Sequence, residues 1–379
     1  MEDVMKRLQG RYADRIEKKM EEYLHLIDEL PQLSIPLIDF LERGGKRFRP
    51  IMCLLSCELV GGDVDAVLPI AASVEMFHNF SLIHDDIEDR GDLRRNKLAL
   101  HLPSKGDALT DISHCPYCDE VMKSPEEAES ILDSVGVKKQ DLPEPYGLSH
   151  AINSGDALLL LSSIAANEVY SAGLDASETQ KAVDIIFFGV LNVCMGQSRD
   201  IDSYEKRFSA KELSEEDVLE TLRLKTGMLI SAGCKAGAII GGGTVEQILG
   251  LGKFCEDISL AFQLQDDILN IDVHGTEYGK EVGGDIEEGK RTLIVVRAFK
   301  ILEGSEKERL LDILDRRNNT EEEKMEAIGI LKDCGAIGYV KEYTDRLLER
   351  AKGSLQIFPD SQAKSDLLEL SDFLVKRGY

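Results

Sequence analysis

Positive charge is scarce in this sequence, and long apolar runs are absent. Its 379 residues include 45 lysines and arginines against 70 aspartates and glutamates, so the formal net charge is −25. A surface this acidic repels nucleic acid and anionic membranes, and we expect no nucleic-acid partner. No uninterrupted apolar stretch reaches the roughly 18 residues that a membrane span needs. We therefore expect no transmembrane segment, no signal peptide and a cytoplasmic location.

We expect the eight cysteines to be reduced rather than paired in disulfides. Most of them lie in apolar stretches with helical spacing, which is typical of reduced, buried thiols in a cytosolic protein. They are Cys53, Cys57, Cys115, Cys118, Cys194, Cys234, Cys255 and Cys334.

What the sequence does have is helical periodicity over a large apolar content. Apolar residues make up 43% of the chain, which is ample for a large core. They recur at helical spacing from the start, through Met5, Leu8, Tyr12 and Ile16, and long stretches downstream behave in the same way. We predict one all-α domain spanning residues 1–379.

An Asp-Asp-x-x-Asp run follows the apolar residues Leu82 and Ile83. On a helix, Asp85 and Asp89 are four positions apart and lie on one face, and Asp86 is three positions from Asp89. Like charges at this spacing repel, so a helix that carries them is suited to hold cations between them. Carboxylate oxygens suit Mg²⁺, which also binds substrate phosphates. A solvated acidic face is the alternative interpretation.

A second acidic run occurs about 180 residues later, again after apolar residues. It contains Gln263, Asp266, Asp267 and Asn270, and the first and last of its Asp/Asn positions have the same four-residue spacing as in the first run. Two such helices facing each other across a core would bind a diphosphate through several metal ions.

Three of the scarce cations gather in one glycine-rich turn, Gly44–Pro50. The two glycines end a helix and allow close approach of the backbone to a ligand. Lys46, Arg47 and Arg49 follow, and such side chains suit a diphosphate. A helix C-cap with cations that favour the helix dipole is the alternative.

The first acidic run has further candidate phosphate ligands beside it. His78 lies two helical turns before Asp85, and Arg94 and Arg95 follow the run. The planar donor forks of the arginines suit a diphosphate. A hydrogen-bonded core histidine and plain salt bridges are the alternatives.

Lysines of the C-terminal half are also candidate phosphate ligands. Lys225 precedes the hydroxyl of Thr226, and the alternative is a helix end capped by Gly227. The charged, Gly-rich segment that holds Lys280 and Lys290 has the composition of a mobile loop that closes over a site.

Taken in order, these motifs resemble those of the trans-polyprenyl (isoprenyl) diphosphate synthase family, most closely its short-chain geranylgeranyl diphosphate synthases. The resemblance covers the chain from about residue 20 to the C-terminus, except for one segment. The matching segments are Gly44-Gly45-Lys46-Arg47-x-Arg49-Pro50, His78, Asp85-Asp86-x-x-Asp89, Arg94-Arg95, Gly155-Asp156-Ala157-Leu158-Leu159, Lys225-Thr226-Gly227, Gln263-x-x-Asp266-Asp267 and Gly279-Lys280 with Asp285 and Lys290-Arg291-Thr292.

The resemblance implies a fold and a reaction. The fold would be a large all-α bundle of ten or more helices around a central active-site cavity, and the protein a homodimer. The enzyme would join isopentenyl diphosphate head-to-tail to an allylic diphosphate with about three Mg²⁺ ions per active site.

The resemblance also implies the roles of individual residues. The expected metal ligands are Asp85, Asp86, Asp89 and Asp266. The expected catalytic residues are Asp85, Asp89, Lys225, Asp266 and Lys280. The expected substrate-binding residues are Lys46, Arg49, His78, Arg94, Arg95, Lys225, Thr226, Gln263, Lys280 and Lys290.

The chain departs from the fullest family pattern at Asn270, where that pattern has aspartate. Asparagine keeps a neutral oxygen ligand and loses a charge, so we expect Asp266 to be the main ligand of the third metal. Product length should depend on the pocket floor before the first acidic run, where Phe80 is large and Ser81 is small. In the resembling family this combination suggests a C20 product, geranylgeranyl diphosphate, with farnesyl diphosphate or a longer chain as the alternative.

The segment outside the resemblance is an insertion, residues 101–146. Its Cys115-x-x-Cys118 has the spacing of a zinc knuckle, and His101, His114 or His150 would complete the ligand set. A redox pair and a solvated insertion with a free dithiol are the alternatives.

Two other classes of protein share part of these features. A class I terpene cyclase has the first acidic run but does not need the Gly-Gly-Lys-Arg turn or a second diphosphate site. A non-catalytic partner or regulatory subunit of a heteromeric synthase usually loses the acidic motifs, and both are kept here.

Overall fold

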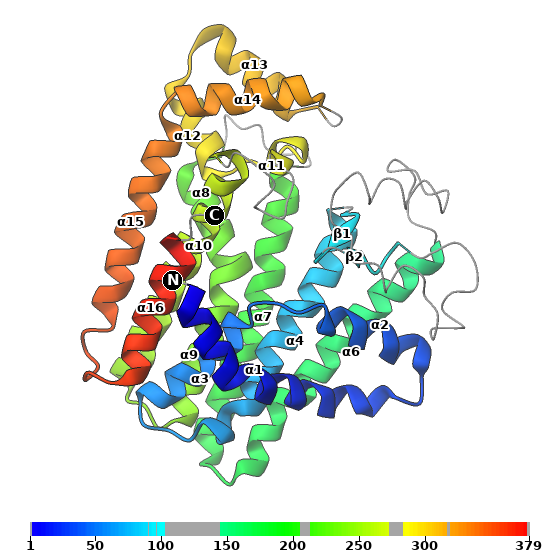
Figure 1. Ribbon diagram of the computed structural model, residues 1–379, viewed down its shortest axis with the longest axis vertical. Helices are drawn as coiled ribbons and strands as arrows, with labels where there is room; N and C mark the ends of the chain where they lie inside the picture. The colour runs from blue at the N-terminus through cyan, green and yellow to red at the C-terminus, as the bar shows by residue number, and fades with distance from the viewer. Residues whose placement is uncertain are drawn as a thin grey trace. The chain divides into compact units, whose positions relative to one another are not determined.

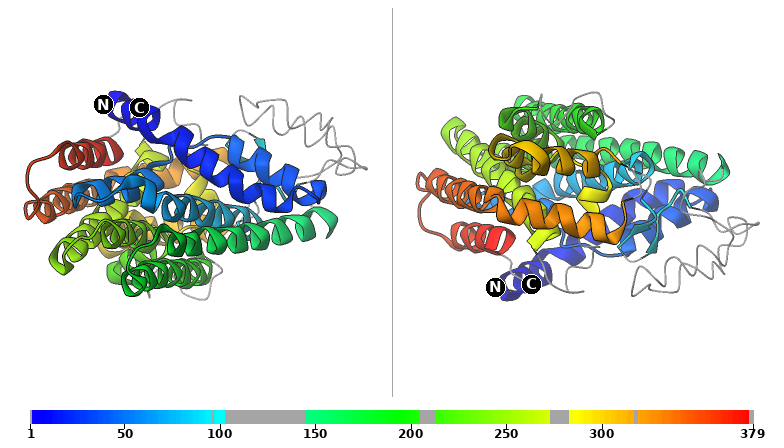
Figure 2. Two further views of the ribbon diagram at one scale, coloured as in Figure 1. Left: turned by 90° about the horizontal axis from the view of Figure 1, so that it is seen from below. Right: turned by 90° about the horizontal axis from the view of Figure 1, so that it is seen from above.

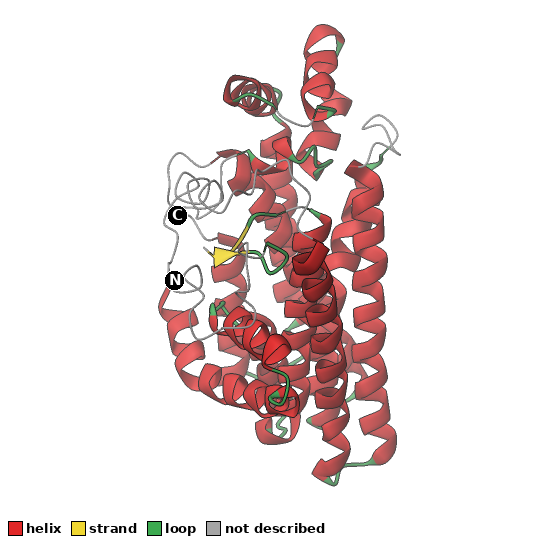
Figure 3. Cartoon of the chain, turned by 90° about the vertical axis from the view of Figure 1, so that its right-hand side faces the viewer, coloured by secondary structure: helices red, strands yellow, loops and turns green. Residues whose placement is uncertain are grey.

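Helices form almost all of the regular structure of the described chain (Figure 3). The computed structural model describes residues 2–89, 91–95, 97–102, 145–204, 213–272, 283–316 and 319–376. Within these ranges the only strands are β1 (Leu93–Arg94) and β2 (Lys97–Leu98), an antiparallel pair in which Leu93 lies opposite Leu98. The predicted all-α fold class is confirmed.

The helices follow the periodic apolar stretches of the sequence. They are α1 (Glu2–Leu24), the 3-10 helix η1 (His25–Ile27), α2 (Pro31–Glu42), α3 (Phe48–Leu59), α4 (Val64–Glu88), α6 (Pro145–Glu168), the 3-10 helix η3 (Val169–Ala172), α7 (Ala176–Tyr204), α8 (Glu215–Leu222), the π-helical turn η4 (Arg223–Gly227), α9 (Met228–Ile240), α10 (Val245–Asp272), α11 (Gly284–Glu287), α12 (Leu293–Ile301), α13 (Gly304–Leu314), α14 (Glu321–Asp333), α15 (Ala336–Ser354) and α16 (Gln362–Lys376).

These helices are distributed over two compact units. Unit 1 consists of Met1–Leu8, Met52–Val64 and Ser177–Tyr379, and unit 2 consists of Gln9–Ile51 and Asp65–Ala176. The chain therefore passes between the units several times, and α1 and α3 contribute residues to both. The single domain that the sequence predicts over residues 1–379 stays a prediction.

Unit 2 is organised around α4, which is apolar on most of its circumference. Among its fully buried side chains are Ile70, Val74 and Phe77, and Phe40 of α2 is equally buried. By length and composition, α4 is the one helix in the described ranges that could cross a membrane, and 72% of its most apolar window is buried inside the protein. That burial is typical of a core helix.

Unit 1 is organised around α10, which packs against α9, α15 and α16 (Figure 1). Leu264 of α10 and Val340 of α15 are fully buried. Arg350 Nε of α15 donates to Asp257 Oδ2 of α10 at 2.7 Å. Helices α15 and α16 lie side by side in both views of Figure 2.

One glycine in unit 1 marks a close approach of two helices. A Cβ built on Gly237 of α9 would collide with the carbonyl oxygen of Cys53 on α3 and would lie 3.4 Å from Cys53 Sγ. The collision is with backbone, which cannot rotate away as a side chain can. The absence of a side chain at residue 237 therefore sets how closely α3 and α9 pack.

We expect Gly237→Ala to lower the free energy of unfolding by about 1–3 kcal/mol, because the added methyl overpacks the contact with Cys53. Gly329→Ala in α14 is the matched control, since nothing lies within 4 Å of its Cβ position. Loss of helical glycine should make the control neutral or more stable by up to about 1 kcal/mol. Urea unfolding followed by circular dichroism measures both. Equal stability of Gly237→Ala and wild type would contradict the close-approach argument.

Candidate active site

The glycine-rich turn of unit 2 places one of its cations, Arg47, against the buried side of α4. Gly44 and Gly45 have φ of +82° and +149°, and Arg47 also has a positive φ of +51°. Glycine adopts such angles readily, whereas they are unfavourable for arginine. Arg47 points inward and is 3% exposed, whereas Lys46 is exposed. The sequence alone did not distinguish these two neighbours.

Arg49 and His78 belong to one positively charged environment. Burial lowers the pKa of Arg49 to about 10, against the opposing charge of Glu75. Burial, with the nearby charges of Arg49 and Arg95 and smaller contributions from Arg94 and Arg47, lowers the pKa of His78 well below its usual range. The imidazole is therefore neutral at pH 7 and offers a hydrogen bond rather than a charge.

Arg94 is held by the first acidic run. Its Nε donates to Asp86 Oδ1 at 2.7 Å, and its Nη2 lies 3.9 Å from Asp85 Oδ2. Asp86 is 1% exposed, and its Oδ2 is buried with no hydrogen-bond partner in the described part of the chain. Burial raises the pKa of Asp86, although the Arg94 charge opposes this. Asp86 is thus placed to orient Arg94, and metal binding by Asp86 stays a prediction.

Asp85 and Asp89 are the more accessible acids of the run. Both are half-buried, and the Asp89 amide donates to the Asp85 carbonyl at 2.8 Å, so the helical turn continues through Asp89. Two carboxylates one turn apart form a hard-oxygen donor set, which fits a divalent cation such as Mg²⁺.

Histidine 84, which the sequence did not single out, joins α4 to α6. Its Nε2 lies 3.3 Å from the Ile152 carbonyl oxygen and 3.7 Å from Asp156 Oδ1. A Cβ on Gly155 would collide with this ring. The glycine of the Gly155-Asp156 motif therefore leaves room for His84 beside the acidic run, and an isolated glycine inside a helical pattern was the available signal.

The two candidate residues for product length, Phe80 and Ser81, lie about one helical turn before Asp85 on α4. Phe80 is 7% exposed and packs edge-to-face with Phe77 and with His84, at centroid distances of 6.4 and 5.4 Å. Ser81 Oγ donates to the His78 carbonyl at 2.8 Å. The aromatic contacts hold Phe80 in place, while the serine adds little bulk.

Unit 1 holds the second group of candidate residues. Lys225 lies in η4, and its Nζ is 2.8 Å from Asp200 Oδ2 of α7. Thr226 beside it is buried. The helix continues from η4 directly into α9, so the alternative that Gly227 caps a helix end is wrong. A π-helical turn shifts the side-chain register locally, and such turns are frequent at functional sites.

The second acidic run lies on α10, with Gln263, Asp266 and Asp267 half-buried. Asn270 is 6% exposed, its carbonyl oxygen accepts from the Gly283 amide at 2.9 Å, and its Oδ1 accepts from the Asp285 amide at 3.3 Å. The amide side chain therefore anchors the turn that begins α11.

Beyond that turn, Lys290 Nζ is 3.5 Å from Asp285 Oδ1 and 2.5 Å from Glu288 Oε2. Lys290 is thus held beside the same turn. That the two acidic helices face each other stays a prediction.

Several predicted residues lie outside the described residues. They are Lys280, Cys115, Cys118, His114 and most of the insertion 101–146. His101, at its edge, is buried, and burial lowers its pKa to about 4. No group of three or more His, Cys, Asp and Glu side chains arranged to hold a metal occurs in the ranges that the structure covers, so zinc has no support there.

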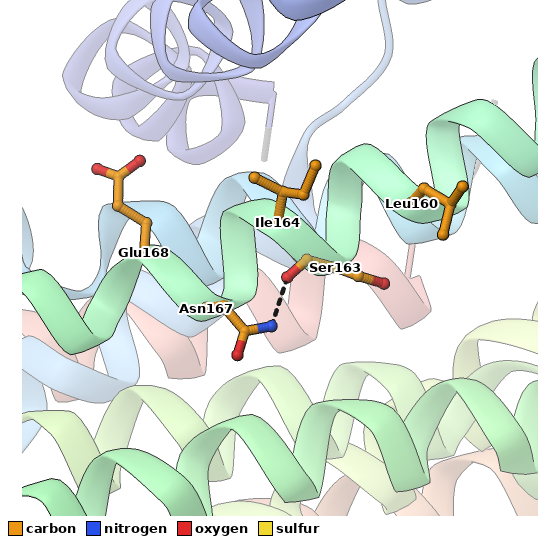
Figure 4. A pocket seen from close by; sticks show the side chains of 5 residues that line it. All are labelled: Leu160, Ser163, Ile164, Asn167 and Glu168. Carbon is orange, nitrogen blue, oxygen red and sulfur yellow. Dashed lines mark hydrogen bonds between the residues drawn. The ribbon is translucent and has the colours of Figure 1, made fainter.

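A hollow of about 640 Å³ lies on α6, and none of the predicted site residues lines it (Figure 4). Leu160, Ser163, Ile164, Asn167 and Glu168 line it, and Asn167 Nδ2 donates to the Ser163 carbonyl at 2.8 Å. Leu160 and Ile164 are 64% and 50% exposed. The lining is therefore an open apolar face rather than a substrate pocket.

Comparison with known proteins gives one consistent result. The polyprenyl synthetase family model matches residues 31–331. A geranylgeranyl diphosphate synthase of Methanosarcina mazei is 32% identical over 352 residues, covering 93% of this chain and 91% of the relative. A geranylfarnesyl diphosphate synthase of Natronomonas pharaonis is 29% identical, covering 97% of this chain and 99% of the relative.

Solved structures agree with the sequence comparison. A geranylgeranyl pyrophosphate synthetase of Pyrococcus horikoshii, 29% identical, superposes with a TM-score of 0.81 and covers 100% of this chain and 99% of its own. A polyprenyl synthase of Caulobacter crescentus, complexed with calcium and isoprenyl diphosphate, is 25% identical, with a TM-score of 0.77 and coverage of 99% and 97%.

The contact between His84 and Gly155 can be tested by a double-mutant cycle. We expect Gly155→Ala to lower the free energy of unfolding by about 1–3 kcal/mol, because its methyl collides with the imidazole. His84→Ala in the same chain should recover part of this loss, giving a coupling energy of about 1 kcal/mol. Gly10→Ala, with nothing within 4 Å, is the control in the same unit. Additive effects in the cycle would rule out the contact.

Proposed function

Because the chain belongs to the polyprenyl synthetase family and is a trans-prenyltransferase, we propose that it makes geranylgeranyl diphosphate. The reaction would be the Mg²⁺-dependent, head-to-tail condensation of isopentenyl diphosphate with an allylic diphosphate. Isoprenyl diphosphates are the substrates that membership of this family implies. The metal, the C20 product and the assignment of each side chain are our proposal.

The observation that carries the proposal is the separation of charge along α4. Asp85 and Asp89 place two half-buried carboxylates at its end. Arg49 and Arg95 form a cationic group near the neutral His78, which lies two helical turns earlier on α4. The acids suit a diphosphate that arrives with metal ions, and the cations suit one that arrives without them. Two diphosphate substrates need two such environments.

The residues present fit a resident divalent cation. Asp85 and Asp89 offer hard oxygen donors at the C-terminal end of α4, and Asp266 offers another on α10. Bound Mg²⁺ would stabilise the negative charge that develops on the departing diphosphate. The solved polyprenyl synthase of Caulobacter crescentus is complexed with calcium and isoprenyl diphosphate, which supports a divalent cation here.

The protein's own side chains would bind and separate the substrates. Arg94 and Lys225 would bind the diphosphate that leaves the allylic substrate. Lys46, Arg49, His78 and Arg95 would bind isopentenyl diphosphate, whose double bond attacks the allylic carbon. Lys280 and Lys290 would close on the bound diphosphate.

The buried apolar side chains around α4 would exclude water, which would otherwise quench the allylic cation. The departing diphosphate would then take the proton that the carbocation formed by the condensation loses, which leaves the neutral product.

The C20 product is supported by Phe80 on α4. Its ring is nearly buried and is held by Phe77 and His84, so it would close the floor of the pocket, whereas Ser81 would leave room beside it. Relatives named for C20 and for C25 products both occur at about 30% identity. Farnesyl diphosphate and longer products are therefore the alternatives.

A homodimer and a cytoplasmic location complete the proposal. Phe188, Leu191 and Met195 of α7 are each more than half exposed and recur at helical spacing. A second copy of the chain would cover such an apolar stripe. Cys53 and Cys234 are among the free, buried thiols of the described residues, which suits a reducing compartment.

The first test is turnover. Purified protein with Mg²⁺, labelled isopentenyl diphosphate and each allylic primer should yield a C20 product, and chelation of the metal should abolish it. Asp85→Ala should lower kcat by about 100-fold or more, because charge stabilisation on the leaving group is lost. Glu88→Gln, an exposed acid of the same turn, should leave kcat within about threefold.

Each contrary outcome has a distinct meaning. A C15 product, or one longer than C20, would retain the enzyme and contradict the Phe80 argument. A folded wild-type protein that binds the substrates without turnover would identify a partner subunit of a heteromeric synthase.

The dimer can be tested separately. Wild type should sediment at twice the chain mass, and Phe188→Asp with Leu191→Asp should sediment as a monomer, because buried charges oppose association. Leu249→Asp is the matched control, a 61% exposed leucine of α10 outside the stripe. Sedimentation velocity measures all three. A double variant that stays dimeric would place the interface elsewhere.

A further inference from the structure

Two polar residues lie in the apolar middle of α4 with no role yet assigned to them. Glu75 is 2% exposed and Asn79 is fully buried, and they are one helical turn apart. A buried carboxylate is costly unless it is paired and hydrogen-bonded. A buried carboxylate beside a site for anions has a further cost, because its negative charge repels the ligand.

Glu75 is paired with Arg47. Arg47 Nη1 donates to Glu75 Oε1 at 2.9 Å, and both side chains are only 2–3% exposed. Arg47 Nη2 donates to the Leu41 carbonyl at 2.6 Å. Two of its donors are thereby fixed to the interior, so Arg47 links α2 to α4.

Asn79 extends the same contact to Arg95. Asn79 Nδ2 donates to Glu75 Oε1 at 3.3 Å and to the Glu75 carbonyl at 2.7 Å, which turns its Oδ1 outward. Arg95 Nη2 donates to this Oδ1 at 3.1 Å. The amide thus links a buried carboxylate to an arginine of the anion site.

The backbone conformation of Arg47 and Arg95 indicates that surrounding contacts hold both residues in place. Arg47 and Arg95, with φ of +51° and +54°, are the two non-glycine residues with positive φ in the described ranges. The left-handed conformation is unfavourable for side chains of this size and persists where surrounding contacts impose it. A Cβ on Gly45 would lie 3.4 Å from both guanidinium groups, so the two arginines meet at that glycine.

We propose that Glu75 and Asn79 are positioning residues that hold Arg95 for the binding of isopentenyl diphosphate, Asn79 by direct contact and Glu75 through Asn79 and the neighbouring Arg47. The inference rests on the proposed function, since it assigns the cationic group to that substrate. Neither residue touches the diphosphate. Glu75 stabilises the arrangement of like-charged arginines before the substrate arrives, and Asn79 sets the direction of Arg95.

The direction in which Glu75→Gln changes the KM for isopentenyl diphosphate distinguishes a positioning role of Glu75 from a purely electrostatic one. If Glu75 contributed only its negative charge, Glu75→Gln would attract the diphosphate more strongly and lower the KM for isopentenyl diphosphate. If Glu75 positions the arginines, Glu75→Gln should raise this KM by about 10- to 100-fold, as expected for loss of a hydrogen bond between charged groups. The KM for the allylic substrate and kcat should change by less than about threefold.

Asn79→Ala provides the second variant, with the same expected rise in KM. Its matched control is Asn192→Ala, because Asn192 Nδ2 also donates to the carbonyl four residues earlier, at 2.7 Å. Asn192 lies on α7 and has no assigned part in anion binding. Thermal unfolding of every variant, followed by circular dichroism, shows whether it folds. If Glu75→Gln does not fold, Asn79→Ala decides.

Titration of inorganic pyrophosphate in the presence of a chelator provides a measurement that does not need turnover. Weaker binding by Asn79→Ala than by wild type and Asn192→Ala supports the inference. An unchanged or lower KM in both variants, or equal pyrophosphate binding, overturns it. Absence of turnover in wild type would instead overturn the proposed function, and the titration would then decide the inference alone.

Discussion

A buried helix that carries charge must have a partner for each charge, and α4 shows how that requirement builds a site. Desolvation of an unpaired carboxylate costs more than most single packing contacts contribute. Glu75 and Asp86 on α4 are both buried, and each is paired with an arginine from outside the helix. The turn before α3 and the β1 strand supply those arginines, so burial on α4 determines where both segments lie.

The same requirement separates binding groups from supporting groups within one short motif. Arg47 donates hydrogen bonds to buried groups of the interior, namely Glu75 and the Leu41 carbonyl. Arg49, two residues later, has its charge close to His78. Along the acidic run, Asp86 is buried and accepts a hydrogen bond from Arg94, whereas Asp85 and Asp89 are half-buried. Alternation between inward and outward residues lets one stretch of chain both stabilise the fold and offer charge to a ligand.

Much of the helical architecture and the order of the motifs could be predicted from the sequence, because periodicity and charge spacing are local properties. The helical turn that joins Asp85 to Asp89 is one example. The choice between Arg47 and Arg49 could not be predicted, since it depends on where Glu75 lies in three dimensions. The contact of His84 with Gly155 joins residues 71 positions apart, and only the packing of α4 on α6 reveals it. Gly227 was open to interpretation as a helix end because glycine is a common C-cap. The π-helical turn instead continues through Gly227 into α9.

The anchoring of α11 by Asn270 has a consequence for the charge of the second acidic run. Asparagine and aspartate share the side-chain oxygen that accepts from the Asp285 amide, and they differ at the other terminal atom. An exchange between them therefore alters the electrostatic potential at the end of α10 while the acceptor that holds the turn is retained. A substitution between asparagine and aspartate at residue 270 would therefore change the affinity for cations while the geometry of the following turn is kept.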